Sequence, residues 1–167
     1  CCDPAGAGRE LCPGCEQSLP VLHHACPRCA IPYEHPDAHG ECGTCQKHPP
    51  AFAHTVALYR YAPPVDHFIR ALKFHRQLAL ARLLGEQLAR RLVPETSPPD
   101  LIMPVPLHNE RLRERGYNQA LEIARPLARA LGVPLDFRSL VRVRATAPQT
   151  GMTIEARRKN LRGAFAL

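Results

Sequence analysis

Residues 101–119, LIMPVPLHNERLRERGYNQ, carry the signal that decides the fold of the larger part of the chain. The run opens with the apolar stretch LIMPV, which has the length of a short buried strand. Pro104 and Pro106 put the end of that strand at a loop, because proline donates no hydrogen bond to a strand ladder. A helical pattern over residues 117–131 follows, and Gly132 is its expected C-terminal cap. Strand, loop and helix in this order indicate an α/β unit.

The flanking segments extend the same alternation. Residues 54–61 are rich in β-formers and predict a strand, and residues 65–92 carry an apolar helical stripe that slips near His75, where we expect a break. Residues 140–143 predict another strand and residues 153–161 a short helix. The order β-α-β-α-β-α predicts a parallel sheet, in which ligands bind beyond the carboxyl ends of the strands. This reasoning places a binding site at the loop after Val105.

That loop is rich in phosphate-binding residue types. Arg111, Arg113 and Arg115 lie on the turn from strand to helix, and Gly116 allows the backbone to approach closely. Asn118 and Gln119 stand at the helix start. Free N–H groups and arginine forks near a helix N-terminus favour an anion, most plausibly a phosphate. A second basic cluster contains Arg157, Arg158, Lys159 and Asn160 and follows Gln149, and Lys73 is a further candidate as the only lysine of the long helix. The alternative is that these clusters are solvated helix faces.

All eight cysteines lie in the first 45 residues, and six of them form the C-x-x-C pairs CPGC, CPRC and CGTC. Two such pairs complete a tetrahedral zinc site with four sulfurs, which has no open position and is therefore structural. Cys26 and Cys29 are expected to share an ion with Cys42 and Cys45. A second site would join Cys12 and Cys15 to Cys2 and to Cys1 or a residue upstream. Five histidines are alternative ligands, although an exposed histidine without a ligand role is the favoured interpretation for each: His23, His24, His35, His39 and His48.

Composition narrows the choice of partners. The chain has 167 residues and a net charge of +7, with 22 Lys and Arg against 15 Asp and Glu. Nearly all the cations are arginine, which favours an anionic partner or reflects a GC-rich genome. No apolar run reaches the roughly 20 residues of a membrane span, and the first residues lack a signal-peptide pattern. Clustered cysteines read as zinc ligands indicate a reducing compartment, so a cytoplasmic location is expected.

Three segments follow the cysteine pairs: YRYAPPVDHFIRALKF, PVPLHNERLRERGYNQA and TAPQTGMTIEARRKNLRGAF. Together with the cysteine pairs, these segments resemble the ComF family of competence-associated proteins. The resemblance implies a zinc ribbon in residues 1–48 and a type I phosphoribosyltransferase-like domain with a parallel sheet in residues 49–167. It also implies a site for 5-phosphoribosyl 1-pyrophosphate with Mg²⁺. The acidic pair followed by a Thr/Gly-rich turn that the family uses to bind the phosphoribosyl group is absent from these residues. We therefore expect a chain truncated at its C-terminus.

Three functions fit the sequence. The first is a phosphoribosyltransferase-like protein linked to DNA uptake, in which pyrophosphate is displaced from the ribose, although no nucleophile or general base is evident and enzymatic activity stays open. The second is a non-enzymatic module that binds single-stranded DNA, or an adaptor for other competence proteins. The low aromatic content of 5% argues against a large surface on which DNA bases stack. The third is a zinc-stabilised interaction domain whose ancestral site has decayed.

Overall fold

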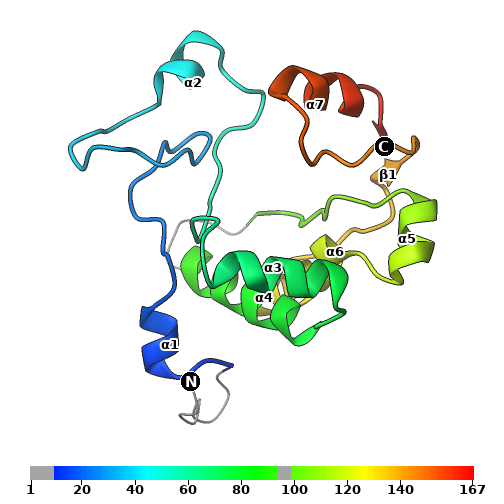
Figure 1. The fold of residues 1–167 in the computed structure, drawn as a ribbon, viewed down its shortest axis with the longest axis horizontal. Helices are drawn as coiled ribbons and strands as arrows, with labels where there is room; N and C mark the ends of the chain where they lie inside the picture. Colours follow the sequence, from blue (N-terminus) through cyan, green and yellow to red (C-terminus); the bar gives the residue numbers. More distant parts are fainter. Residues whose placement is uncertain (1–9, 94–98) are drawn as a thin grey trace. The chain divides into compact units, whose positions relative to one another are not determined.

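A computed structural model describes residues 10–93 and 99–167 of the chain. The chain forms two compact units, residues 1–70 and residues 71–167, and each is described by itself. Figure 1 shows the elements in chain order. Their bounds are α1 Pro13–Gln17, α2 Gly43–Lys47, α3 Val65–Phe74, α4 Ala79–Leu92, α5 Asn109–Arg115, α6 Gln119–Leu131, β1 Val141–Arg142, α7 Ile154–Leu161 and β2 Phe165–Ala166.

The first unit is organised around its cysteines. The short helices α1 and α2 each begin directly after a cysteine, and Cys12 and Cys42 have nearly the same extended backbone, with φ −69° and ψ 158° for Cys12 and φ −68° and ψ 157° for Cys42. Cys26 is 1% exposed and Cys45 4% exposed, so thiols occupy positions that apolar side chains hold in a larger core. A segment this poor in buried apolar groups needs another source of stability, such as a bound metal.

The strand expected over residues 54–61 is reduced to a single antiparallel bridge between Tyr59 and Val21. Two backbone hydrogen bonds flank the bridge, from Leu22 N to Leu58 O and from Arg60 N to Pro20 O, each 2.8 Å long. The segment therefore pairs with the cysteine-rich part of its own unit. The domain boundary expected near residue 48 remains a prediction.

The expected break in the long helical pattern is confirmed. Helix α3 ends at Phe74 and α4 starts at Ala79, on either side of His75. Arg76, between the two helices, adopts a left-handed backbone with φ 53°, a conformation that costs energy for a residue with a side chain. The chain therefore changes direction at this point, and the apolar stripe continues on a second helix.

The core of the second unit is the contact between α4 and α6. Leu83, Leu84 and Leu127 are buried there, and each such side chain contributes roughly 1.5–3 kcal/mol to stability. The helices approach most closely at Gly85, where an added Cβ would lie 2.4 Å from the carbonyl oxygen of Ile123 and 2.5 Å from Pro126 Cγ. Only glycine fits this crossing without a shift of the backbone.

The expected parallel sheet is not found in the described part of the chain. Its one named sheet pairs β1 with β2 in antiparallel register, with Val141 opposite Ala166 and Arg142 opposite Phe165. The predicted strand at residues 101–105 forms an isolated parallel bridge between Ile102 and Leu135. Pro104 and Pro106 cannot donate ladder hydrogen bonds, which limits further pairing along this segment. The fold is thus mixed α and β, with a small sheet.

The helical predictions in the C-terminal half are confirmed. Helix α6 begins after Asn118, whose Oδ1 accepts a hydrogen bond from Ala120 N at 3.0 Å, and it ends at Gly132 with φ 67°. Helix α7 begins after Thr153, whose hydroxyl accepts a hydrogen bond from Ala156 N. One prediction is wrong in detail, because most of the expected arginine loop is the helix α5. Across the described ranges no helix is both long and apolar enough to cross a bilayer.

Candidate functional site

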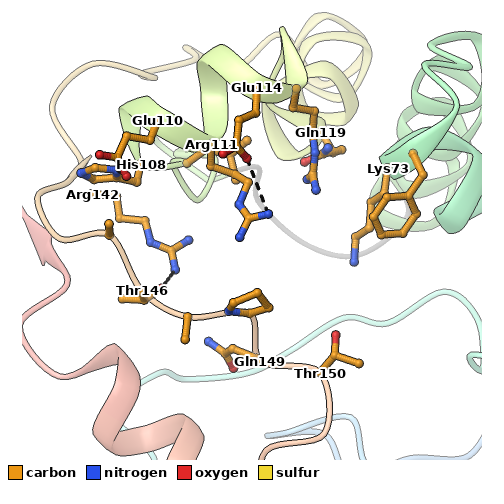
Figure 2. A pocket seen from close by; sticks show the side chains of 16 residues that line it. Lys73, His108, Glu110, Arg111, Glu114, Gln119, Arg142, Thr146, Gln149 and Thr150 are labelled. Carbon is orange, nitrogen blue, oxygen red and sulfur yellow. Dashed lines mark hydrogen bonds and ion pairs between the residues drawn. The ribbon is translucent and has the colours of Figure 1, made fainter.

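A basic cavity of about 610 Å³ lies in the second unit, between α5 and the segment that follows β1. Figure 2 shows its side chains pointing inward from both walls, with Lys73 at one side. The polar and charged lining residues are Lys73, His108, Glu110, Arg111, Glu114, Arg115, Gln119, Arg142, Thr146, Gln149 and Thr150. We call this space the anion cavity.

Helix α5 supplies one wall because of the spacing of its residues. Arg111 and Arg115 stand four residues apart and share one face of the helix, so both reach the cavity. Arg113 lies between them in sequence, is exposed, and is not among the lining residues. Gly116 ends the helix in a left-handed conformation with φ 84°, and this turn leads directly to the start of α6 and to Gln119.

Three buried side-chain nitrogens in the cavity form no hydrogen bond among the described residues, and one of them, His108 Nδ1, lies 3.6 Å from Glu110 Oε2, an ion pair only when the ring is protonated. They are Nδ1 of His108, Nε2 of Gln119 and Nε of Arg142, and no other side-chain nitrogen or oxygen in the described ranges is buried in this way. An unpaired buried polar group costs about 1–3 kcal/mol. Buried polar groups usually have a hydrogen-bond partner, so these three nitrogens mark the cavity as the place in the described ranges where such partners are missing.

The charges in the cavity favour an anion, although carboxylates are also present. Lys73, Arg111, Arg115 and Arg142 face Glu110 and Glu114. Arg111 Nη1 lies 3.8 Å from Glu114 Oε2, an ion pair between well exposed groups that contributes little to stability. An arriving phosphate can therefore compete for Arg111 at small cost.

Other hydrogen bonds hold the opposite wall in place. The hydroxyl of Thr146 accepts a hydrogen bond from Arg142 Nη2, as Figure 2 shows. Asn160 Nδ2 on α7 donates to the carbonyl oxygen of Ala147 at 2.9 Å, and Arg144 Nη2 donates to the carbonyl oxygen of Asn160 at 2.9 Å. Asn160, one residue of the second basic cluster, thus anchors the segment that lines the cavity.

The structure brings together five of the nine residues that the sequence singled out for phosphate: Lys73, Arg111, Arg115, Gln119 and Gln149. Gly116 and Asn118 line a neighbouring cavity, and Asn118 is used structurally, since its amide also donates to Val105 O at 3.0 Å. Arg157 is exposed on α7, and Asn160 acts through the carbonyl of Ala147.

Sequence reasoning missed His108 and Arg142. Both are half-buried, and each holds one of the unpaired nitrogens. His108 directly follows the proline-rich strand end, so its place in the loop after Val105 was a usable signal. Arg142 stands in a predicted strand, and only the pairing of β1 with β2 shows which way its side chain turns.

The second candidate site is the cysteine cluster of the first unit. The Sγ atoms of Cys26, Cys29, Cys42 and Cys45 all lie within 4.8 Å of one another, and Cys29 Sγ lies 3.8 Å from Cys42 Sγ. A zinc ion bound at about 2.3 Å by four sulfurs would separate them by about 3.8 Å. The donors thus fit a structural zinc ion in number, type and spacing.

The pKa values of two thiols in this cluster are shifted in opposite directions. Burial raises the pKa of Cys45 to about 12, whereas the pKa of Cys26 falls to about 6. Burial also acts to raise the Cys26 value, but N–H groups of Cys42, Cys29 and Arg28 outweigh it. A divalent cation would allow all four sulfurs to be thiolates together.

The predicted second zinc site is only half described. Cys12 and Cys15 form a knuckle in which Cys15 N donates to Cys12 Sγ at 3.4 Å. Cys1 and Cys2, which were expected to complete that site, lie outside the described residues. Among the described residues, the histidines proposed as alternative ligands join no metal-binding group.

These features define a class of protein in which a four-cysteine module is joined to a mixed α/β unit with a basic cavity. The chain is 37% identical over 162 residues to the DNA utilization protein YhgH of Salmonella typhimurium, covering 94% of this chain and 70% of that protein. It is 35% identical to the protein of the same name from Escherichia coli K12, with the same coverage. It is also 35% identical over 168 residues to competence protein F of Haemophilus influenzae, covering 96% of this chain and 71% of that protein.

The chain therefore belongs to the ComF family. No family profile matches the chain, and no solved structure matches it.

Proposed function

We propose that the anion cavity binds a phosphorylated ribose of the 5-phosphoribosyl 1-pyrophosphate type, and that the protein serves the use of DNA taken up by the cell. The binding of a phosphorylated ribose is supported by the three buried nitrogens of His108, Gln119 and Arg142 that lack a hydrogen-bond partner. Phosphate oxygens accept several hydrogen bonds each and carry the negative charge that the surrounding cations favour. The names of the relatives, DNA utilization protein and competence protein F, support the link to the use of DNA.

Different residues of the cavity suit different parts of this ligand. Lys73 and Arg111 are exposed or partly exposed cations suited to a charged pyrophosphate end. Gln119 and Thr146 offer neutral polar groups that suit ribose hydroxyls. Mg²⁺ would arrive with the ligand, because this ion is usually held by substrate phosphates with one or two carboxylates. Glu110 and Glu114 are the carboxylates available in the cavity.

Transferase chemistry is a further part of the proposal. When pyrophosphate leaves the anomeric carbon, negative charge grows on its oxygens, and fixed cations stabilise that charge in the transition state. Arg111 and Arg115 are placed on one helix face to do so. No described side chain in the cavity is an activated nucleophile, so displacement would occur directly between the ribose and an acceptor.

The cysteine module has a structural role in this proposal. A zinc ion held by Cys26, Cys29, Cys42 and Cys45 would stabilise a unit with few buried apolar side chains. Reduced cysteines of this kind fit the cytoplasm.

Calorimetric titration of the zinc-loaded chain with 5-phosphoribosyl 1-pyrophosphate, with and without Mg²⁺, tests the binding. Arg111→Ala and Arg115→Ala should each weaken affinity about tenfold, because each removes a charged hydrogen bond. Arg113→Ala is the matched control, since it removes the same charge from the same helix outside the cavity. Equal losses in all three variants would mean that only the general charge matters, and no binding by the parent protein would refute the proposal.

A further inference from the structure

Phe74 combines exposure with a fixed position beside the anion cavity. It is the last residue of α3, 67% of its surface is exposed, and it lines both the anion cavity and an adjoining cavity of about 350 Å³. Among the described residues that line these two cavities, Phe74 is the aromatic residue common to both. An exposed phenylalanine costs solvation energy, which a bound partner would recover.

One hydrogen bond joins the end of α3 to the turn between α5 and α6, and the Arg76 side chain lies near the same turn. The hydroxyl of Tyr117 donates to the carbonyl oxygen of Leu72, two residues before Phe74. The guanidinium of Arg76, two residues after Phe74, lies next to Gly116, since a Cβ built on that glycine would be 3.7 Å from Arg76 Nη2. The hydrogen bond to Leu72 therefore anchors the backbone just before the ring.

An arginine already stacks near the ring. The guanidinium carbon of Arg115 lies 5.8 Å from the centre of the Phe74 ring, within the range of a cation–π contact. The adjoining cavity is lined by Lys73, Arg76, Arg111 and Arg115, with Glu114 as its one described carboxylate. A flat ring with several cations around it is complementary to a nucleobase joined to phosphates.

We propose that Phe74 is a stacking platform for one base of single-stranded DNA, whose phosphates contact Lys73 and Arg76. The inference rests on the DNA-related part of the proposed function and names its contact surface. A ribose pyrophosphate has no base to stack, so that ligand does not require the Phe74 ring, although Lys73 is common to the two proposed sites. The bound strand would pass along the mouth of the anion cavity, where phosphates meet exposed cations.

Fluorescence anisotropy with two labelled oligonucleotides tests the proposal. One is an oligothymidylate of about 12 nucleotides, and the other is a fully abasic strand of the same length, which keeps the phosphates and lacks the bases. The parent protein should bind the thymidylate strand about tenfold more tightly than the abasic strand, because stacking adds to the phosphate contacts. Phe74→Ala should remove that difference, and Phe74→Tyr should keep it.

Two variants serve as controls. Phe74→Leu keeps an apolar side chain and loses the aromatic ring, so it should behave like Phe74→Ala if stacking is the cause. Phe137→Ala removes another exposed phenylalanine with arginines beside it, outside both cavities, and should leave the difference unchanged.

Equal affinity of the parent protein for the two strands would overturn the proposal, as would a difference that persists in Phe74→Ala. Complete displacement of the strand by thymidine 5′-monophosphate at a similar concentration would show that the ring binds free nucleotides. This result would also overturn the proposal. Binding of the ribose pyrophosphate is measured separately in the parent protein. A protein that binds the pyrophosphate but not DNA refutes this inference alone, and the opposite result refutes the anion-cavity proposal alone.

Discussion

Nε of Arg28 lies 2.7 Å from Oε1 of Glu41, and this ion pair joins the two cysteine knuckles. Arg28 stands inside the CPRC knuckle, and Glu41 directly precedes Cys42 of the CGTC knuckle. Arg28 Nη1 also donates to the carbonyl oxygen of Phe52 at 3.0 Å. The hydrogen bond and charge of Glu41 raise the pKa of Arg28, so the guanidinium keeps its charge beside the cysteine cluster.

Arg28→Ala should weaken zinc binding by at most about 10- to 100-fold, the usual loss of affinity when a group that orients metal ligands is removed, and the weaker binding should appear as faster loss of zinc to a chelator. The rate is measured by absorbance of a zinc-sensitive dye under excess chelator. Arg28→Lys should recover only part of the effect, because lysine cannot bond Glu41 and Phe52 in the same fork geometry. An unchanged rate in Arg28→Ala would show that the ion pair is a surface contact alone.

Substitution of single cysteines should reveal which thiols share an ion. Cys42→Ser should lower the zinc content by one equivalent and unfold the first unit, because Cys42 belongs to the four-sulfur cluster. Cys15→Ser should leave that equivalent in place. Metal analysis of the purified variants by mass spectrometry provides the measurement. The pairing would be contradicted if Cys15→Ser also loses one equivalent and the Cys15→Ser/Cys42→Ser double variant loses no more than one.

Gln119→Met should stabilise the ligand-free protein while weakening binding. The buried Nε2 of Gln119 has no partner among the described residues, and removing an unpaired buried donor can recover about 1–3 kcal/mol. The same change should lower affinity for 5-phosphoribosyl 1-pyrophosphate several-fold. Denaturant unfolding and calorimetry on one protein sample test the two halves. A variant that loses both stability and binding would show that Gln119 has a structural partner in solution.

Gly85→Ala should destabilise the second unit by about 1–3 kcal/mol, because the added Cβ would collide with the carbonyl of Ile123. Gly43→Ala is the control, since the structure places no atom within 4 Å of a Cβ there. Thermal unfolding monitored by circular dichroism gives the comparison. Equal melting temperatures of Gly85→Ala and the parent would mean that α4 and α6 can separate at no cost.

Lowering the pH should reduce the contribution of Asp136 to the stability of the folded protein. A hydrogen bond with the Ser139 side chain, together with N–H groups of Arg138 and Ser139, lowers the pKa of this carboxyl. A lowered folded-state pKa adds stability above the ordinary value near 4, and that stability is lost as the pH falls through the folded-state pKa. The parent should therefore exceed Asp136→Asn in melting temperature at neutral pH, and the gap should close in acid. Asp100→Asn provides the control for the general effect of charge.

Much of the helical structure was predictable because its signals are local. The break near His75, the cap residues Asn118 and Thr153, and the end of α6 at Gly132 follow from short-range spacing and backbone preference. The parallel sheet was not found in the described part of the chain, because strand pairing depends on partners far away in sequence. The arginine segment was expected to be a loop, whereas residues 109–115 form a helix.

The sequence alone determined the residue types and the spacing of both sites. It predicted paired cysteine knuckles and identified Arg111, Arg115 and Gln119, since C-x-x-C pairs and arginines four residues apart constrain geometry over a few bonds. The sequence also predicted that Cys26 and Cys29 meet Cys42 and Cys45, and the cysteine cluster confirms this grouping. Tertiary structure decided which buried nitrogens remain without a hydrogen bond. His108 and Arg142 became part of the site only because α5 and β1 face one space. The physical reason is that burial and hydrogen-bond satisfaction depend on what surrounds a group, and the surroundings are assembled from distant parts of the chain.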